Sequence, residues 1–174
     1  MIYFVRHGET DYNLKRLIQG RGINVSLNET GRLSAEKARE NLRGVSLDKI
    51  YSSPLLRAKE TAEIINKDFD LEIVCDDRLI EVGVGEREGT TWESWSKEQN
   101  EAFWDNPAKF GAETPAEVFE RVGSFFDEHK NSNENILIVS HAGVYKYLYR
   151  TIHGITDVRK DISAPKNAEI VIIK

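Results

Sequence analysis

Apolar runs alternate with amphipathic stretches along this chain. The first run, Ile2–Val5, and a later run, Ile136–Val139, have no polar position among their apolar residues. Such runs are typical of parallel strands that are buried on both faces of a sheet. Shorter runs predict three further strands at 49–52, 71–75 and 168–173.

Four amphipathic helices are predicted in the intervals between the strands. Asn28 is a suitable N-cap for the first, and Ser53 followed by Pro54 is typical of a helix start. Thr114 and Glu117 have the spacing of a capping box at the third. The four helices are expected at 28–43, 53–65, 114–130 and 144–152. This alternation predicts an α/β fold with a mostly parallel central sheet and helices on both faces.

An aromatic stretch separates the third strand from the third helix. All three tryptophans lie within it, in about twenty residues. Its rings are Trp92, Trp95, Phe103, Trp104 and Phe110. We interpret the stretch as a small satellite core in a lid segment at about 86–114. The same rings are placed to form the rim of a ligand pocket.

Composition narrows the class of protein. A chain of 174 residues is one ordinary domain, and its net charge of −5 and pI near 5.5 argue against nucleic acid or a membrane surface as partner. The apolar start is too short for a signal peptide or a membrane span, which makes the cytoplasm the expected location. Cys75 is the single cysteine, in an apolar run, and is predicted to be a buried, inert thiol.

Cationic and imidazole groups follow the predicted strands. Arg6 and His7 follow the first strand, His141 follows the fourth, and Arg57 lies in the first turn or so of the second helix. Right-handed crossovers place the carboxyl ends of parallel strands along one edge of a sheet, where ligands bind. The sequence therefore predicts a crevice with two guanidinium and two imidazole groups.

That set of groups suits a phosphoryl group, whose negative charge is spread over three oxygens. One histidine can attack phosphorus in line while the other, protonated, helps to bind the oxygens. His7 and His141 lack the ligand spacing of a zinc site, so no metal is expected. His129 at a helix end and His153 before a glycine are interpreted as surface or capping histidines.

Four blocks in the chain surround these groups with further polar residues. They are Arg6–Thr10 with Asn13, Gln19 and Gly20; Ser52–Leu55 with Arg57, Ala58, Thr61 and Ala62; Leu79–Glu81 with Gly85, Glu88 and Gly89; and Val139–Gly143. In these blocks the chain resembles the histidine phosphatase superfamily, the phosphoglycerate mutase-like proteins. The resemblance covers nearly the whole chain. It implies one histidine-phosphatase-like domain over 1–174, with the lid or insert at about 86–114.

The resemblance implies a catalytic role for five residues. His7 would be the nucleophile that forms a phosphohistidine, while Arg6, Arg57 and His141 would bind the phosphoryl oxygens. Glu81 would be the general acid that protonates the leaving oxygen and then activates water. Such an acid accelerates the reaction roughly 10²–10⁴-fold, because an alkoxide is a poor leaving group.

Other residues complete the site that the resemblance implies. Asn13 would be an additional donor, with Gln19, Gly20 and Ala142 also in the phosphate-binding set. Glu86 and Glu88 are rivals to Glu81, although both are more simply interpreted as surface carboxylates. Members of the family need neither a metal nor an organic cofactor, and none is expected here.

Some positions depart from the family pattern. Tyr12 and Arg87 stand where a tryptophan is common, and Asn24 and Ser26 replace the usual acidic residue and proline. None of them removes a catalytic group. They change the expected lining of the pocket, and so leave the substrate undefined.

Three functions are weighed on this basis. The first is a metal-independent phosphatase acting on a small phosphorylated metabolite, since small relatives act on α-ribazole phosphate, phosphoglycerates or sugar phosphates. The second is a phosphoglycerate mutase, which is disfavoured because the sixty positions from Glu81 to His141 hold few cations. The third, a non-catalytic phospholigand-binding protein, is disfavoured because every chemical group is present. The aromatic segment suggests a ligand with a flat ring, and the sequence leaves open whether the chain forms a homodimer.

Overall fold

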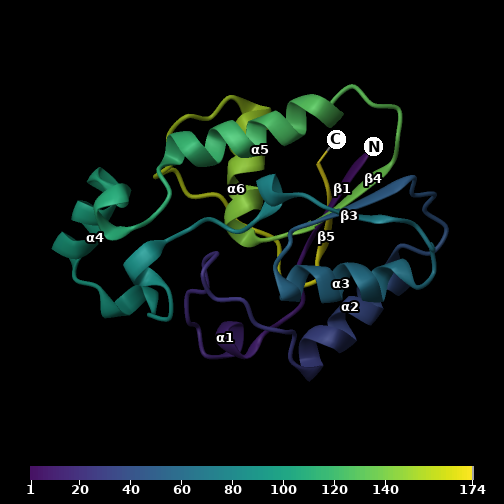
Figure 1. The fold of residues 1–174 in the computed structure, drawn as a ribbon, viewed down its shortest axis with the longest axis horizontal. Helices are drawn as coiled ribbons and strands as arrows, with labels where there is room; N and C mark the ends of the chain where they lie inside the picture. Colours follow the sequence, from purple (N-terminus) through teal and green to yellow (C-terminus); the bar gives the residue numbers. More distant parts are fainter. Residues whose placement is uncertain (174) are drawn as a thin grey trace.

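A five-stranded sheet forms the centre of the protein in the computed structural model, which describes residues 1–173. The strands lie in the order β3-β2-β4-β1-β5; β5 is antiparallel to β1, whereas the other pairs are parallel. Their bounds are Ile2–Arg6 (β1), Lys49–Ser52 (β2), Ile73–Cys75 (β3), Ile136–Ser140 (β4) and Ile170–Ile172 (β5). The predicted α/β architecture is confirmed (Figure 1).

Alternate residues of the two central strands enter two separate cores. Phe4 of β1 and Ile138 of β4 face one core, whereas Val5 and Val139 face the other. All four are at most 1 % exposed. Because both faces are covered, these strands contain no polar alternation, which is why the apolar runs predicted them well.

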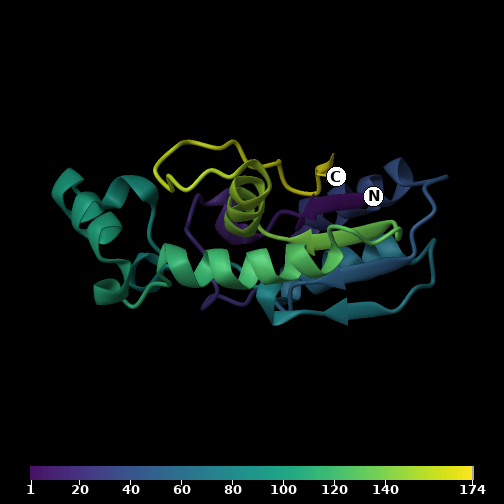
Figure 2. The ribbon, with the colours of Figure 1, turned by 90° about the horizontal axis from the view of Figure 1, so that it is seen from above.

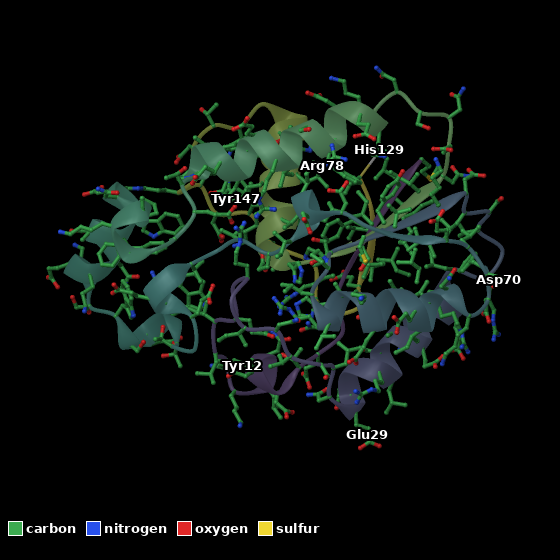
Figure 3. The ribbon with its side chains drawn as sticks, in the orientation of Figure 1. Tyr12, Glu29, Asp70, Arg78, His129 and Tyr147 are labelled. Carbon is green, nitrogen blue, oxygen red and sulfur yellow. The ribbon has the colours of Figure 1, made fainter. Side chains whose placement is uncertain are left out.

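Helices cover each face of the sheet. One layer holds α2 and α3, and the opposite layer holds α5 and α6 (Figures 1 and 2). Figure 3 shows Tyr147 and His129 in the α5–α6 layer and Glu29 at the start of α2 on the other side. The α-helices are Asp11–Leu14 (α1), Glu29–Asn41 (α2), Leu56–Asn66 (α3), Lys97–Asp105 (α4), Pro115–His129 (α5) and Ala142–His153 (α6). Short 3₁₀ turns span Asp77–Leu79, Gly85–Arg87, Trp92–Ser94 and Pro107–Phe110.

Two helix caps are confirmed, and one predicted helix start is wrong. Asn28 caps α2, and Thr114 with Glu117 forms the capping box of α5. Helix α3, however, begins at Leu56 and not at Ser53. The Ser53 hydroxyl is hydrogen-bonded to His141 Nε2 at 2.7 Å, so it faces the sheet edge instead of capping a helix.

Two side chains differ in exposure from what was predicted because of tertiary packing. Cys75 is exposed, since it is the last residue of the edge strand β3. His129 is buried and not on the surface: its ring stacks on Phe125 with centroids 4.4 Å apart, and packs edge-on against Tyr51 at 4.7 Å. Its Nδ1 donates to the Phe125 carbonyl at 2.8 Å in the last turn of α5, so the alternative of a capping histidine is confirmed. His153, by contrast, is exposed at the end of α6, as predicted.

The aromatic segment, residues 86–114, projects beyond the sheet with α4 at one end of the molecule (Figures 1 and 2). Trp95, Phe103 and Phe110 form the small separate core that was predicted, with Phe103 5.8 Å from Phe110 and 6.0 Å from Trp95 between ring centroids. The other two predicted rings, Trp92 and Trp104, are 55 % and 37 % exposed. The Arg87 guanidinium is buried in this core, 4.4 Å from the Trp92 ring and 4.8 Å from that of Trp95. Within residues 1–173, none of the helices combines the length and apolar character needed to cross a bilayer.

Candidate active site

The pairing of β1 with β4 brings the two predicted site histidines together. Arg6 pairs with Ser140 in the parallel ladder, and the His7 amide donates to the Ser140 carbonyl at 2.9 Å. His141 follows Ser140, so both imidazoles leave the sheet at the same edge. Their ring centroids are 5.1 Å apart. The predicted juxtaposition of His7 and His141 is therefore present.

His7 is held in a defined protonation state. Its Nδ1 lies 2.7 Å from the Gly8 carbonyl oxygen. Because a carbonyl only accepts hydrogen bonds, Nδ1 carries the proton and Nε2 carries the lone pair. Burial, followed by the charges of Arg57 and Arg6, holds the pKa of His7 well below its usual value. The imidazole is thus neutral at neutral pH, as a nucleophile must be.

His141 is fully buried, with one ring nitrogen paired and the other without a partner. Nε2 lies 2.7 Å from the Ser53 hydroxyl, whereas Nδ1 is buried without a hydrogen-bond partner among the described residues. Burial, then the charge of Arg57, lowers its pKa well below the usual value. An orphaned buried ring nitrogen beside the nucleophile fits a polar ligand atom at that place.

Arg6 and Arg57 bring two guanidinium groups to the histidines. Arg57 is buried and donates to the carbonyls of Ile23 at 2.7 Å and Gly20 at 2.8 Å. Arg6 donates to the Pro165 carbonyl at 3.1 Å. Burial lowers the pKa of Arg57 to about 10, and it lowers that of Arg6 as well. Neither has an ion-pair partner in the described part of the chain, so the site is locally cationic within an acidic protein.

Asn13, on the short helix α1, and Gln19, in the loop after α1, border the same cavity. The Asn13 side-chain oxygen accepts from the Thr10 amide and hydroxyl, each at 3.1 Å, and from Asn167 at 3.4 Å. Its oxygen is therefore occupied, and its NH₂ group is the part available to a ligand. Gln19 is mostly buried, and its side-chain oxygen lies 3.1 Å from the Thr10 hydroxyl oxygen, so it shares the single proton of that hydroxyl with Asn13.

Gly20 and Ala142 border the cavity through their backbones. Gly20 has φ +57°, and its carbonyl is the one that Arg57 holds. Ala142 is the first residue of α6, whose N-terminus lies at the cavity. A helix N-terminus favours negative charge, which adds to the cationic character of the site.

Glu81 is the one of the three rival carboxylates that borders the cavity. Its oxygens accept from the Val82 amide at 2.9 Å and the Gly143 amide at 3.3 Å. A side chain at position 143 would overlap the Glu81 carboxylate and the Val82 side chain, so any larger residue there would displace the Glu81 carboxyl group. Glu86 is exposed, and Glu88 is bound to the Gly22 amide at 3.2 Å.

The cavity has a volume of about 720 Å³ and two chemically different parts. The inner part contains the predicted groups described above; His141 lies buried beside His7, behind the lining. The outer part is lined by the aromatic segment, by α6 and by the loop that follows α6. Its residues include Trp92, Phe103, Trp104, Lys146, Arg159 and Lys160. Among residues 1–173, no group of three or more His, Cys, Asp or Glu is arranged to hold a metal ion.

The sequence did not indicate several residues that hold the site together. Ser53 has the pattern of a helix cap, which concealed its contact with His141. The Thr61 hydroxyl accepts from the Gly8 amide at 2.9 Å and donates to the Arg57 carbonyl at 2.7 Å. Asn167 donates to the His7 carbonyl at 2.9 Å, from a loop distant in sequence. In the sequence, the only indication of these roles was that Ser53 and Thr61 both belong to the second of the four blocks.

Comparison with known proteins identifies the family. The family model of the histidine phosphatase superfamily (branch 1) matches residues 2–174. The chain belongs to the histidine phosphatase superfamily. It is 36% identical to the uncharacterized phosphatase PhoE of Bacillus subtilis, over 88% of this chain and 77% of that protein. It is 35% identical to putative phosphoserine phosphatase 2 of Hydrogenobacter thermophilus, over 88% of this chain and 79% of that one.

A solved structure agrees with this assignment. A mycobacterial glucosyl-3-phosphoglycerate phosphatase aligns with a TM-score of 0.84 at 26% identity, covering 97% of this chain and 90% of the other. The predicted resemblance and fold are therefore confirmed. The family and the relatives named as phosphatases support the assignment of this protein as a phosphatase.

Proposed function

We propose that the protein hydrolyses a small phosphomonoester through a phosphohistidine on His7. The observation that carries this proposal is the state of His7. It is buried beside two guanidinium groups that form no ion pair within residues 1–173, and the Gly8 carbonyl leaves its Nε2 with the lone pair. A neutral imidazole in a cationic pocket suits attack on an anionic phosphoryl group.

The first half-reaction transfers the phosphoryl group to the enzyme. His7 Nε2 forms a bond to phosphorus while the bond from phosphorus to the ester oxygen breaks. Glu81, in its protonated form, donates its proton to that oxygen, and the alcohol leaves. Arg6, Arg57 and the Asn13 amide stabilise the charge on the equatorial oxygens, and His141 Nδ1 is the additional donor once it is protonated.

The second half-reaction releases inorganic phosphate. Glu81, now a carboxylate, takes a proton from water as the water oxygen attacks phosphorus. The bond from phosphorus to Nε2 breaks, and His7 returns to its neutral state. Every proton and electron pair is then restored, so the cycle requires no metal and no organic cofactor.

The leaving group would occupy the outer part of the cavity. Lys146 and Lys160 line this part together with Trp92 and Trp104. Two of the proteins compared above are named for phosphoserine and glucosyl-3-phosphoglycerate, both of which carry a carboxylate. We therefore favour a phosphomonoester with a second negative group, with a flat-ring alcohol as the competing hypothesis. The mutase has less support, because the aromatic segment contributes one lysine to the lining, Lys97.

The test is phosphate release from a panel of esters in the presence of EDTA. The panel contains phosphoserine, 3-phosphoglycerate, glycerol 2-phosphate, 1-naphthyl phosphate and p-nitrophenyl phosphate. We expect turnover by the native protein and none above background by His7→Ala, with the carboxylate-bearing esters preferred. Equal kcat/KM for esters with and without a carboxylate would refute the substrate class. Turnover by His7→Ala would refute the mechanism.

A further inference from the structure

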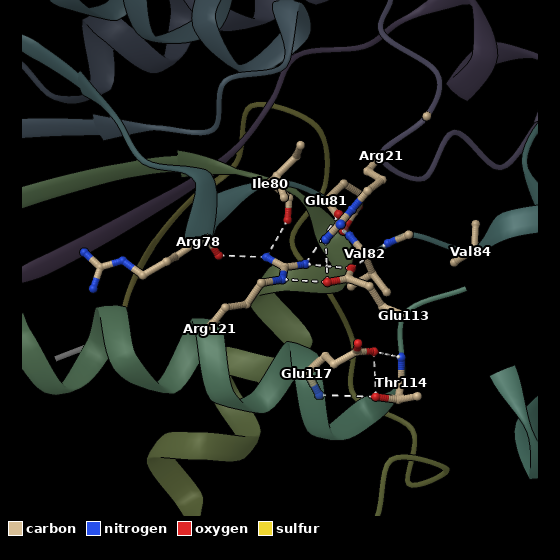
Figure 4. A network of polar contacts seen from close by, with 12 residues as sticks. Arg21, Arg78, Ile80, Glu81, Val82, Val84, Glu113, Thr114, Glu117 and Arg121 are labelled. Carbon is tan, nitrogen blue, oxygen red and sulfur yellow. Dashed lines mark hydrogen bonds and ion pairs between the residues drawn. The ribbon is translucent and has the colours of Figure 1, made fainter. Parts of the chain in front are cut away.

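We propose that Arg121 and Glu113 are positioning residues that fix the Glu81 carboxyl group for proton transfer. This inference rests on the proposed function, in which Glu81 is the general acid. Arg121 lies on α5 and Glu113 just before it, and neither residue belongs to the four sequence blocks. The close-up in Figure 4 shows both beside the chain segment that carries Glu81.

Glu81 lies on a segment that lacks regular secondary structure. The segment runs from the 3₁₀ turn Asp77–Leu79 to an isolated bridge between Val84 and Ala112. No strand ladder therefore holds the Glu81 backbone. A general acid must nevertheless lie within hydrogen-bond reach of the oxygen that it protonates. The surrounding structure has to supply the missing rigidity.

Arg121 supplies it by binding the backbone on both sides of Glu81. Its Nη1 donates to the carbonyls of Arg78 and Ile80, each at 2.7 Å, and Nη2 donates to the Glu81 carbonyl at 3.4 Å. The guanidinium thus binds three carbonyls of an irregular segment from one rigid helix. Its planar fork is suited to this task in a way that a lysine ammonium is not.

Glu113 completes the arrangement from the other side. Its carboxylate accepts from Arg121 Nε at 2.9 Å and from Nη2 at 3.1 Å, a bidentate pair. It also accepts from the Gly83 amide at 2.7 Å, two residues beyond Glu81. Both side chains are largely buried, at 15% and 12% exposure, so water screens the pair only weakly.

The five N–H groups of Arg121 match these five contacts, which leaves none for a substrate. Arg121 is also absent from the lining of the cavity. It therefore acts through Glu81 and not on the reacting atoms. Arg21 forms an ion pair with Glu113 and is the neighbour of Gly20, whose carbonyl Arg57 holds. The Glu113 carboxylate thus joins the loop that contains Gly20 and Arg21 to the segment that carries Glu81 (Figure 4).

A comparison of leaving groups separates positioning from a merely structural role. An alkyl ester needs its leaving oxygen protonated, whereas p-nitrophenolate leaves readily without an acid. For Arg121→Met we expect kcat/KM to fall about 30-fold on the best alkyl ester of the panel and less than about 3-fold on p-nitrophenyl phosphate. The loss on the alkyl ester is a part of the roughly 10²–10⁴-fold acceleration that a general acid provides. Arg121→Lys keeps the charge without the fork and should resemble Arg121→Met.

Arg39→Met is the matched control. Arg39 is a similarly buried arginine on α2 with ion pairs to Glu36 and Asp68, and neither it nor its partners lie in the Glu81 segment. Its loss should lower the unfolding temperature with no preference between the two esters. Glu113→Gln is the second test variant should Arg121→Met not fold, and it should show the same preference for the aryl ester.

The double variant Glu81→Gln/Arg121→Met decides the coupling. If Arg121 acts through Glu81, the double variant loses no more activity on the alkyl ester than Glu81→Gln alone. Additive losses of activity in the double variant would overturn the inference. Equal losses of activity on the alkyl and aryl esters in both Arg121→Met and Glu113→Gln would overturn it as well. If Glu81→Gln itself shows no leaving-group preference, the proposed role of Glu81 fails, which is a different outcome.

Discussion

The inner and outer parts of the cavity are built in different ways. The inner groups lie at the ends of β1 and β4 or on α3, and the side-chain hydrogen bonds of His7 and Arg57 are to backbone carbonyls of the adjoining loops. The outer part is built from the aromatic segment, where 3₁₀ turns and the short helix α4 surround Arg87. This contrast suggests that chemistry is assigned to the inner part and leaving-group selection to the outer part.

Replacing Arg57 should give the largest effect among the supporting residues. Under the proposed function, Arg57→Met removes a buried charge that would contact the phosphoryl oxygens, and it also removes the anchor of the carbonyls of Gly20 and Ile23. We expect kcat/KM to fall about 10³-fold on every ester, comparable with the loss of a charged transition-state contact. Steady-state kinetics across the panel measures this. A loss confined to bulky esters would show that the inner part also selects the leaving group.

Replacing Ser53 should have an intermediate effect. Ser53→Ala removes the partner of His141 Nε2 and leaves the ring free to change its tautomer. We expect about a tenfold loss of kcat on all esters, with about 1 kcal/mol lost from the free energy of unfolding. Ser52→Ala is the neighbouring control, because the Ser52 hydroxyl is bound to the Ser53 carbonyl and touches neither histidine. Equal loss of kcat in both variants would contradict the role of Ser53.

Acid should destabilise the inner part selectively. His7 and His141 have pKa values held well below the ordinary value by burial and by Arg57, so the unfolded chain binds protons that the native chain does not. Their contribution to the free energy of unfolding is complete above about pH 6.5. As the pH falls below that value, the free energy of unfolding decreases by up to about 1.4 kcal/mol per pH unit for each histidine. Denaturant titrations at pH 7.5 and 5.5 measure this change.

A matched variant assigns the acid sensitivity to the histidines. His141→Asn removes one of the two groups and should flatten the dependence of unfolding free energy on pH by about half. The aromatic segment contains no histidine and all three tryptophans, so native tryptophan fluorescence should stay constant over the same range. An unchanged slope in His141→Asn would contradict the assignment.

Replacing Arg87 should give the smallest effect on the chemistry. Arg87→Met removes the cation from the three surrounding rings and its hydrogen bond to Asn100 at 2.6 Å. We expect kcat/KM for glycerol 2-phosphate to stay within about twofold, while KM for 1-naphthyl phosphate rises several-fold. Should glycerol 2-phosphate lose as much as it does in Arg57→Met, the two parts of the cavity would not be separable.

The same contrast explains what the sequence could predict. Arg6, His7 and His141 follow directly from apolar strands, because a strand end fixes where the next residue lies. Arg57 follows because its helix starts close to the end of β2. The arrangement that brings these four groups together was predictable, since it depends on strand order and crossover hand alone.

Residues that act through tertiary contacts could not be predicted in this way. Arg121 is an ordinary surface-type residue in the helical pattern, and its partners are three carbonyls of an irregular segment. Ser53 has the pattern of an N-cap but binds an imidazole from β4. The exposure of Cys75 and His129 was misjudged because an edge strand exposes one and the face of α5 on β2 buries the other.

The most direct test of the account is to trap the phosphoenzyme. The native protein is mixed with its best ester, quenched in alkali within milliseconds, and digested for mass spectrometry under alkaline conditions that preserve phosphohistidine. The account predicts a single acid-labile phosphoryl group on the peptide that contains His7, at Nε2, and none in His7→Ala. Turnover without a trapped adduct, or an adduct on His141, would contradict it.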